Sequence, residues 1–366
     1  MTTARDARFM GVALGLGRRG WGKVWPNPAV GCVIAQGDRV VGRGWTQDGG
    51  RPHGETVALE QAGAAARGAT AYVTLEPCAH TGQTPPCADA LISAGIGRVV
   101  VAISDPDPRV AGRGIAKLRA AGIEVREGVL RQAAARDQRG FLIRVTADRP
   151  MVTLKLATSF DGRIATQGGD SQWITGAEAR RFGHALRASH DAVLIGAGTA
   201  RADDPTLTAR DMGARRQPVR IVAARNLDLP IPSNLTETAR QVPVWVVHGP
   251  YASPGRREDL IAEGVDLVEA ELAPDRQIDM GAMMEALAAR GLTRVYCEGG
   301  GALAASLLRA GLVDDLVVFT AGVALGAEGR PVLGALGLDS LAEAQRFGLA
   351  DVRRIGPDTL TVWTRV

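Results

Sequence analysis

Four side chains in the first quarter of the sequence have the types and the order that metal-dependent hydrolysis requires. His53 and Glu55 stand two residues apart, and Cys78 and Cys87 each follow a proline. One neutral imidazole and two thiolates would balance the charge of Zn²⁺ and leave the fourth tetrahedral position open for water. A carboxylate that is not a ligand can carry the proton of that water to a departing amine. The pattern predicts a zinc-dependent deaminase in which Glu55 moves the proton.

Local patterns predict the elements that hold the first three of these residues. Residues 55–62 have helical periodicity, so His53 and Glu55 are expected in the first turn of a helix. Residues 71–75 are expected to form a strand that ends shortly before Cys78. Glu55 would then lie beside the metal without ligating it.

The second cysteine follows a long loop. Pro86 suits an early helical position, so Cys87 is expected at a helix N-terminus, where the dipole and free N–H groups should lower the pKa of its thiol. The common deaminase signature is Pro-Cys-x-x-Cys, whereas AHTGQTPP separates the cysteines here. The longer loop adds polar groups that could contact a substrate larger than a bare nucleobase: His80, Thr81, Gln83 and Thr84.

The remaining cysteines and the composition favour a soluble cytoplasmic enzyme. Cys32 and Cys297 lie in apolar, strand-like runs, where buried inert thiols are favoured over ligands. Four cysteines, two of them assigned to zinc, argue against a disulfide framework. No run of roughly 20 apolar residues and no signal-like N-terminus occurs, so neither membrane insertion nor export is expected.

Charge and aromatic content argue against a nucleic-acid partner. The net charge is +4, but the basic residues are spread along the chain and form no dense run. Three tyrosines and six phenylalanines offer little for base stacking. Mild basicity equally suits a small phosphorylated substrate, which is the partner we expect.

Alternating helix and strand patterns predict two α/β domains, residues 1–147 and 148–366. The first is expected to place helices on both faces of a mixed sheet. In the second, the strand 294–297 runs into Glu298 and three glycines, Gly299 to Gly301, before a helix. Bare backbone amides at such a helix start can cradle a phosphate, although a glycine turn without a ligand remains the alternative. A similar turn at residues 196–199 favours a dinucleotide site.

Longer segments resemble one enzyme family. PNPAVGCV, the H-G-E box, TLEPCAHTGQTPPC, LKLATSFDGRIA, SQWIT, ADDPTLTAR and CEGGGALAASL resemble the bifunctional riboflavin-biosynthesis deaminase/reductases, in the family's domain order. The resemblance implies an N-terminal cytidine-deaminase-like α/β/α domain and a C-terminal dihydrofolate-reductase-like α/β domain. It implies hydrolysis of the 2-amino group of 2,5-diamino-6-ribosylamino-4(3H)-pyrimidinone 5′-phosphate. NADPH-dependent reduction of the ribosyl group then gives 5-amino-6-ribitylaminouracil 5′-phosphate.

The resemblance also implies a role for individual residues of this sequence. It makes His53, Cys78 and Cys87 the zinc ligands and Glu55 the proton donor. The implied NADPH contacts are Ala157, Trp173, Thr199, Asp203, Gly300, Gly301, Ala302, Leu303, Ala304, Ala305 and Ser306. The implied substrate contacts are Asn27, Ser171, Arg187, Asp203, Leu207, Arg210 and Glu298. A guanidinium offers paired donors to the substrate phosphate, although an ion-pair role for either arginine is the alternative without the resemblance.

Three positions complete the comparison with the family. Thr46 stands where many relatives have histidine, and Gln83 stands where a basic residue is common, so the resemblance does not carry over the details of phosphate recognition in the deaminase site. Lys155, a cation in an otherwise apolar strand, could hydrogen-bond the opening ribose oxygen and is assigned to the substrate site. Its alternative is a strand-end lysine that reaches solvent.

Two other classes of protein share parts of this pattern. A nucleic-acid-editing deaminase would have the shorter cysteine spacing and a basic strand-binding surface, and it would not explain the second domain. A binding protein with structural zinc would have four protein ligands and no use for a free Glu55. We therefore expect a bifunctional enzyme, and a homo-oligomer, either dimer or tetramer.

Overall fold

The computed structural model describes residues 4–80, 85–108, 110–214 and 216–366, and these residues form two compact units that divide between Asp148 and Arg149. The expected loop residues Thr81, Gln83 and Thr84 lie outside the described residues. The first unit contains α1 (Ala4–Gly17), η1 (Arg18–Gly20), β1 (Gly31–Gln36), β2 (Arg39–Trp45), α2 (Gly54–Ala62), η2 (Gly63–Ala66), β3 (Thr70–Val73), α3 (Cys87–Ser93), β4 (Arg98–Val101), α4 (Arg113–Ala120), β5 (Glu124–Glu127), α5 (Arg131–Asp137) and α6 (Arg139–Ala147).

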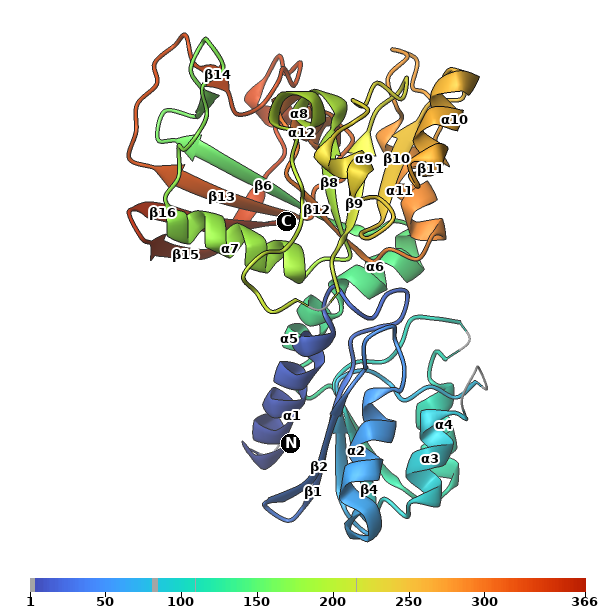
Figure 1. Cartoon of the computed structure of the whole chain (residues 1–366). Coiled ribbons are helices and arrows are strands. Elements are labelled where there is room, and N and C mark those ends of the chain that lie inside the picture. The colour runs from blue at the N-terminus through green and yellow to red at the C-terminus, as the bar shows by residue number, and fades with distance from the viewer. Residues whose placement is uncertain (1–3, 81–84, 109, 215) are drawn as a thin grey trace. The chain divides into compact units, whose positions relative to one another are not determined.

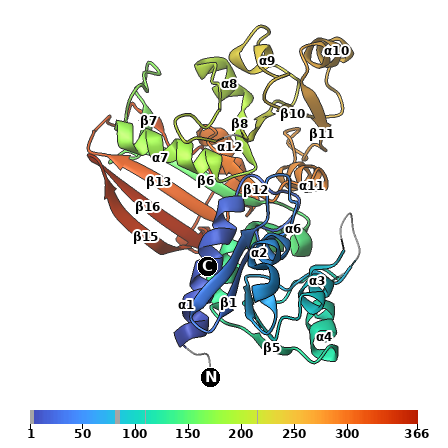
Figure 2. The ribbon, with the colours of Figure 1, turned by 60° about the horizontal axis from the view of Figure 1, so that its bottom comes forward.

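The first unit is a three-layer α/β/α structure around a mixed sheet of order β2-β1-β3-β4-β5. Strand β1 is antiparallel to β2 and β3, whereas β3, β4 and β5 are parallel. Helices α1 and α2 lie on opposite faces of this sheet (Figures 1 and 2). Helix α2 approaches β2 so closely that a Cβ on Gly44 would lie 2.1 Å from the carbonyl oxygen of Gly54. The glycine therefore lets the start of α2, which carries Glu55, rest directly on the sheet.

The second unit contains β6 (Met151–Ser159), β7 (Arg163–Ala165), α7 (Ala177–Ala188), β8 (Ala192–Gly196), α8 (Ala197–Asp203), β9 (Val219–Ala223), α9 (Asn234–Glu237), β10 (Val244–His248), α10 (Pro254–Ala262), β11 (Asp266–Glu269), α11 (Met280–Ala289), β12 (Arg294–Cys297), α12 (Gly301–Arg309), β13 (Asp315–Ala321), β14 (Arg330–Pro331), η3 (Leu341–Glu343), β15 (Phe347–Ile355) and β16 (Asp358–Arg365). Its main sheet has the order β11-β10-β9-β8-β12-β6-β13-β16-β15. All neighbours from β11 to β13 are parallel, and β16 and β15 add antiparallel pairs at one edge.

Burial explains why the central strands are nearly continuous apolar runs. Strands β8, β9 and β10 are buried along almost their whole length, as expected of parallel strands covered on both faces. Helix α7 covers part of β13 and β16, where its residues pack with Phe319 and Leu360 (Figure 1). None of the described helices is long and apolar enough to cross a membrane.

Candidate functional site

The three predicted metal ligands converge in the first unit. His53, Cys78 and Cys87 present ligand atoms that all lie within 4.8 Å of one another. His53 Nδ1 is 3.3 Å from Cys87 Sγ and 3.8 Å from Cys78 Sγ. His53 is the N-cap of α2 and Cys87 is the first residue of α3, as the sequence predicted. One imidazole and two sulfurs at this spacing fit a tetrahedral zinc site with one position left for water.

Cys78 and Cys87 lie close enough to share a proton. The amide at the start of α3 belongs to Cys87 itself and donates to Cys78 Sγ at 3.3 Å. The pKa of Cys78 is lowered to about 4, first by the hydrogen bond from the Cys87 thiol and also by His53 and this amide. While the two thiols share this proton, the hydrogen bond to Cys78 and burial raise the pKa of Cys87. The helix start therefore stabilises a thiolate at Cys78.

Glu55 lies beside these ligands in the first turn of α2. Its side chain is only 3% exposed. Burial raises its pKa to about 7, although the charge of His53 acts in the opposite direction. A carboxyl group with a pKa near neutrality can both accept and return a proton, as deamination requires.

A cavity of about 750 Å³ opens over the metal ligands. His53, Cys78 and Glu55 line it together with His80 and Asn27. His80 Nδ1 is buried and has no hydrogen-bond partner among the described residues, so it can serve a bound molecule. The cavity also has polar lining residues that the sequence analysis did not identify: Arg51, Glu76, Asp105, Asp107, Arg113 and Arg144.

Asn27 and Thr46 occupy one wall of this cavity. Asn27 Nδ2 donates to the carbonyl oxygen of Gly50 at 3.2 Å, which fixes the orientation of its amide. Thr46 is 2% exposed. Its hydroxyl accepts from the amide of Val30 and donates to the carbonyl oxygen of Pro28, each at 3.0 Å. These hydrogen bonds of Thr46 therefore hold the Pro28–Val30 segment, which directly follows Asn27.

In the second unit, Arg187, Glu298 and Lys155 form a charged cluster. Arg187 binds both oxygens of Glu298, with Nε–Oε1 at 2.5 Å and Nη2–Oε2 at 3.1 Å. Lys155 Nζ lies 4.0 Å from the same carboxylate, so the alternative of a lysine that simply reaches solvent is wrong. The alternative role for Arg187 was a surface ion pair. Arg187 does pair with Glu298, but this ion pair is mostly buried.

The pKa values in this cluster follow from burial and opposite charges. Burial alone would raise the pKa of Glu298, but Arg187 and Lys155 together hold it below its usual value. Burial lowers the pKa of Lys155, and Glu298 opposes that effect. The cluster therefore keeps a carboxylate charged beside a lysine that can release its proton more easily than usual.

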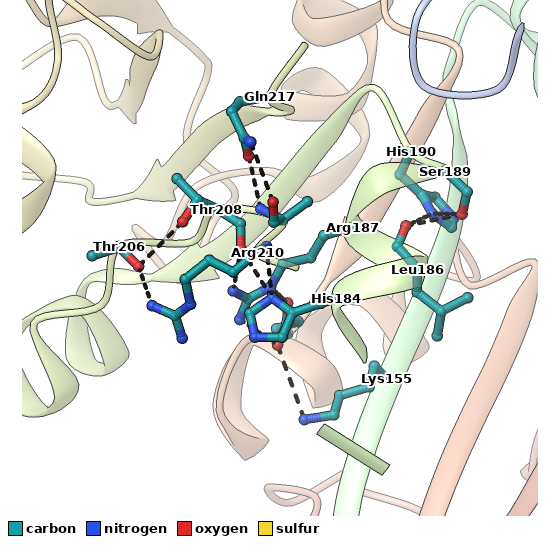
Figure 3. A network of polar contacts seen from close by, with 12 residues as sticks. Lys155, His184, Leu186, Arg187, Ser189, His190, Thr206, Thr208, Arg210 and Gln217 are labelled. Carbon is teal, nitrogen blue, oxygen red and sulfur yellow. Dashed lines mark hydrogen bonds and ion pairs between the residues drawn. The ribbon is translucent and has the colours of Figure 1, made fainter. Parts of the chain in front are cut away.

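A turn after α8 carries Arg210 and is held from two sides (Figure 3). His184 Nδ1 lies 3.1 Å from the carbonyl oxygen of Thr208 and 3.3 Å from the amide nitrogen of Arg210. Gln217 binds both the amide and the carbonyl of Ala209, at 2.7 and 3.2 Å. Sequence reasoning missed His184, although its place one helical turn before Arg187 puts both on one face of α7.

The predicted glycine turn joins Thr199 on α8. The amide of Gly300 donates to Thr199 Oγ1 at 3.2 Å, which brings the two predicted turns together. Gly300 is the N-cap of α12, so bare amides stand at the start of that helix. Leu303, Ala304 and Ala305 are buried, which leaves their backbones rather than their side chains for any contact.

The other predicted residues of the second unit are more scattered. Trp173 is 68% exposed, and the guanidinium of Arg180 lies 4.6 Å from the centre of its ring. Ser171 and Asp203 are exposed. Leu207 is buried in the core, so only its backbone can face a ligand. Of the predicted set, the structure joins Lys155, Arg187 and Glu298 directly, and Thr199 with Gly300.

Fold and site together define a zinc-dependent deaminase unit joined to a reductase unit. The family model "Cytidine and deoxycytidylate deaminase zinc-binding region" matches residues 3–103, and "RibD C-terminal domain" matches residues 150–361. The riboflavin biosynthesis protein RibD of Escherichia coli K12 is 42% identical over 361 residues, which cover 97% of this chain and 98% of the relative. That of Aquifex aeolicus is 38% identical and covers 98% of each chain.

Solved structures agree over the full length. RibD of Acinetobacter baumannii superposes with a TM-score of 0.88 at 38% identity and covers 99% of both chains. The diaminohydroxyphosphoribosylaminopyrimidine deaminase/5-amino-6-(5-phosphoribosylamino)uracil reductase of Thermotoga maritima gives 0.86 at 33% identity. The chain belongs to the RibD family, and it is a bifunctional riboflavin-biosynthesis enzyme with a zinc-binding deaminase domain and an NADPH-dependent reductase domain. The predicted fold class and pair of activities are confirmed.

Proposed function

We propose that the first unit hydrolyses the 2-amino group of 2,5-diamino-6-ribosylamino-4(3H)-pyrimidinone 5′-phosphate. The second unit then reduces the ribosyl group of the deaminated product to ribityl with NADPH. The observation that carries the first step is the buried Glu55 beside three converging ligand atoms. The names of the Thermotoga maritima relative support the substrate and the order of steps.

In the deaminase, each residue of the chain has a separate task. His53, Cys78 and Cys87 hold zinc, which when bound supplies the Lewis acidity that lets water attack at neutral pH. Glu55 takes a proton from the attacking water and gives it to the departing amine. Asn27, fixed on Gly50, contacts the pyrimidine.

Three arginines support recognition of the phosphate in the same cavity. Arg51, Arg113 and Arg144 all line it, and guanidinium groups suit a phosphate because they donate paired hydrogen bonds. Thr46 cannot take this task, because its hydroxyl already bonds the Pro28–Val30 segment. The departure from histidine at this position therefore shifts phosphate binding to the arginines.

In the reductase, the amides at the start of α12 and Thr199 hold the NADPH phosphates, since anions bind at helix N-termini. NADPH, when bound, supplies the hydride. Lys155 hydrogen-bonds the opening ribose oxygen and gives it a proton, a step that its lowered pKa favours. Arg210, exposed on its held turn, binds the substrate phosphate, whereas Arg187 keeps Glu298 charged and in place.

We also propose a cytoplasmic location and a homo-oligomer. A location in the cytoplasm would give the enzyme NADPH and a phosphorylated substrate. The cysteines of the described structure are free, which suits a reducing compartment. Sedimentation of the purified chain at several concentrations would test the oligomer, and a monomer throughout would contradict it.

A single substitution separates the two proposed activities. Glu55→Gln should abolish ammonia release from the diaminopyrimidine substrate, keep bound zinc, and leave NADPH oxidation with the deaminated substrate unchanged. Glu60→Gln, an exposed change on the same helix, is the matched control and should leave both activities intact. Ammonia release by the Glu55→Gln protein at the wild-type rate would overturn the assignment of Glu55.

A further inference from the structure

Glu76 is a buried carboxylate that the proposed chemistry leaves without a role. It lies between the end of β3 and the ligand Cys78, and it is 3% exposed. Its backbone amide donates to the carbonyl oxygen of Ile103 at 3.0 Å, after the end of β4. A buried carboxylate is costly unless its oxygens are bonded, so the partners of this side chain indicate what it does.

The Glu76 carboxylate accepts hydrogen bonds from four backbone amides of one segment. Oε1 accepts from Gly114 at 2.9 Å and from Ile115 at 3.2 Å. Oε2 accepts from Gly112 at 3.0 Å and from Asp105 at 3.3 Å. The carboxylate therefore occupies the start of α4, where free amides favour an anion.

The same segment forms a wall of the cavity above the metal ligands. Asp105, Asp107, Val110 and Arg113 line that cavity together with His53 and Glu55. Asp107 is in turn tied to Asp105, because its amide donates to Asp105 Oδ1 at 2.9 Å. A shift of the segment would move these four wall residues relative to the metal ligands.

We infer that Glu76 is a positioning residue of the deaminase: it fixes the cavity wall formed by Asp105, Asp107, Val110 and Arg113 at the distance from the metal ligands that the ribosyl phosphate substrate requires. The inference rests on the proposed deaminase function of the first unit. Glu76 lies two residues from Cys78, so one short stretch of chain holds both a metal ligand and the residue that positions the cavity wall. Loss of the Glu76 carboxylate should weaken substrate binding more than it slows the chemical step.

Glu76→Gln tests this directly, because the amide keeps the shape but turns one acceptor into a donor that faces backbone N–H groups. We expect the KM for the diaminopyrimidine substrate to rise about tenfold, with kcat within about threefold and zinc content unchanged. Asp6→Asn is the control for the loss of a buried carboxylate in the same unit. Asp6 is 1% exposed, pairs with Arg98 and does not line the cavity, so its variant should keep the wild-type KM.

A milder pair of substitutions decides the question if Glu76→Gln fails to fold. Gly112 and Gly122 flank α4, have φ of 82° and 78°, and are exposed, with no atom within 4 Å of the position that a Cβ would take. Alanine strains both backbones alike, but only Gly112 donates to Glu76. Gly112→Ala should raise the KM by about threefold or more, and Gly122→Ala should not change it.

The outcomes separate this inference from the proposed function. A wild-type enzyme that releases ammonia, with an unchanged KM in both Glu76→Gln and Gly112→Ala, would overturn the inference alone. Equal KM changes in Gly112→Ala and Gly122→Ala would also overturn it. Absence of ammonia release by the zinc-loaded wild-type protein would overturn the proposed function and this inference with it.

Discussion

Arg187 on α7 binds both carboxylate oxygens of Glu298 at the end of β12, at 2.5 and 3.1 Å. This pair joins a helix to the residue that opens the glycine turn of the reductase. Arg187 also donates to the carbonyl oxygen of Thr208 at 3.0 Å, so the same guanidinium supports the turn that carries Arg210. One ion pair therefore connects the cofactor side and the phosphate side of the proposed reductase site.

Removal of the Glu298 charge should damage the reductase alone. In Glu298→Gln, Arg187 and Lys155 lose their common counter-charge, and breaking a mostly buried pair of this kind typically costs about 3 kcal/mol. We expect loss of NADPH oxidation with the deaminated substrate and an earlier unfolding transition of the second unit. Ammonia release from the diamino substrate should be unchanged.

The control for this variant is an exposed ion pair of the same unit. Arg201 pairs with Asp228, and both side chains are about half exposed (47% and 53%). Asp228→Asn should cost less than about 1 kcal/mol and leave NADPH oxidation intact, because surface pairs contribute little. A Glu298→Gln protein that reduces as fast as the Asp228→Asn protein would contradict the role of the cluster.

Removal of zinc should abolish the deaminase activity and leave the reductase activity, which is the opposite of the effect expected for Glu298→Gln. All three ligand residues belong to the first unit, and the proposed reductase residues belong to the second. Chelation should abolish ammonia release while NADPH oxidation with the deaminated substrate continues, and added Zn²⁺ should restore the lost activity. Parallel loss of both activities on chelation would contradict independent sites.

The hydroxyl of Thr199 should matter for the cofactor. Thr199→Val keeps the shape but removes the acceptor for the half-buried amide of Gly300, and the loss of such a hydrogen bond costs about 1 kcal/mol. The KM for NADPH should rise about tenfold, measured by NADPH oxidation with the deaminated substrate. Thr359→Val, an exposed change on β16, is the control. Equal KM values for the two variants would contradict the proposed cofactor turn.

Buried His190 should make the second unit sensitive to acid. Its Nδ1 donates to the carbonyl oxygen of Leu186 at 2.7 Å, and its Nε2 accepts from Thr153 at 2.9 Å. Burial lowers its pKa from 6.5 to about 3. Because the unfolded chain then binds the proton more tightly, the stability that neutral His190 contributes is lost as pH falls below about 6.5.

Urea unfolding at two pH values tests whether the free energy of unfolding falls as the pH is lowered. Between pH 7 and pH 5 the wild-type protein should lose about 2 kcal/mol that a His190→Gln variant does not lose. Glutamine keeps one donor and one acceptor, so the comparison isolates the titration. The same pH dependence in both proteins would contradict a buried neutral imidazole.

The metal site could be predicted because its signals are local in the sequence. His53 and Glu55 share one helix turn, and the two Pro-Cys steps mark the other ligands. The amide of Cys87 at the start of α3 points to Cys78, a contact that spacing does not show. Glu76 was missed for the same reason, since its partners lie about 30 to 40 residues further along the chain.

The fold shows the same division between local and distant signals. Buried strands such as β8 and β10 are apolar runs, so their sequences carry a local strand signal. Strand β5, with the sequence EVRE, and strand β15, which is exposed along most of its length, lack that signal. They form because a neighbouring strand pairs with them, which depends on the assembled sheet.

The central claim is that two sites in this chain act in a fixed order on one phosphorylated pyrimidine. The most direct measurement incubates zinc-loaded protein with the diaminopyrimidine ribosyl phosphate, with and without NADPH, and follows ammonia and NADPH separately. We predict equal ammonia release in both samples, and NADPH oxidation that begins only after a lag in which deaminated product accumulates. NADPH oxidation without prior ammonia release, or no ammonia in either sample, would contradict the account.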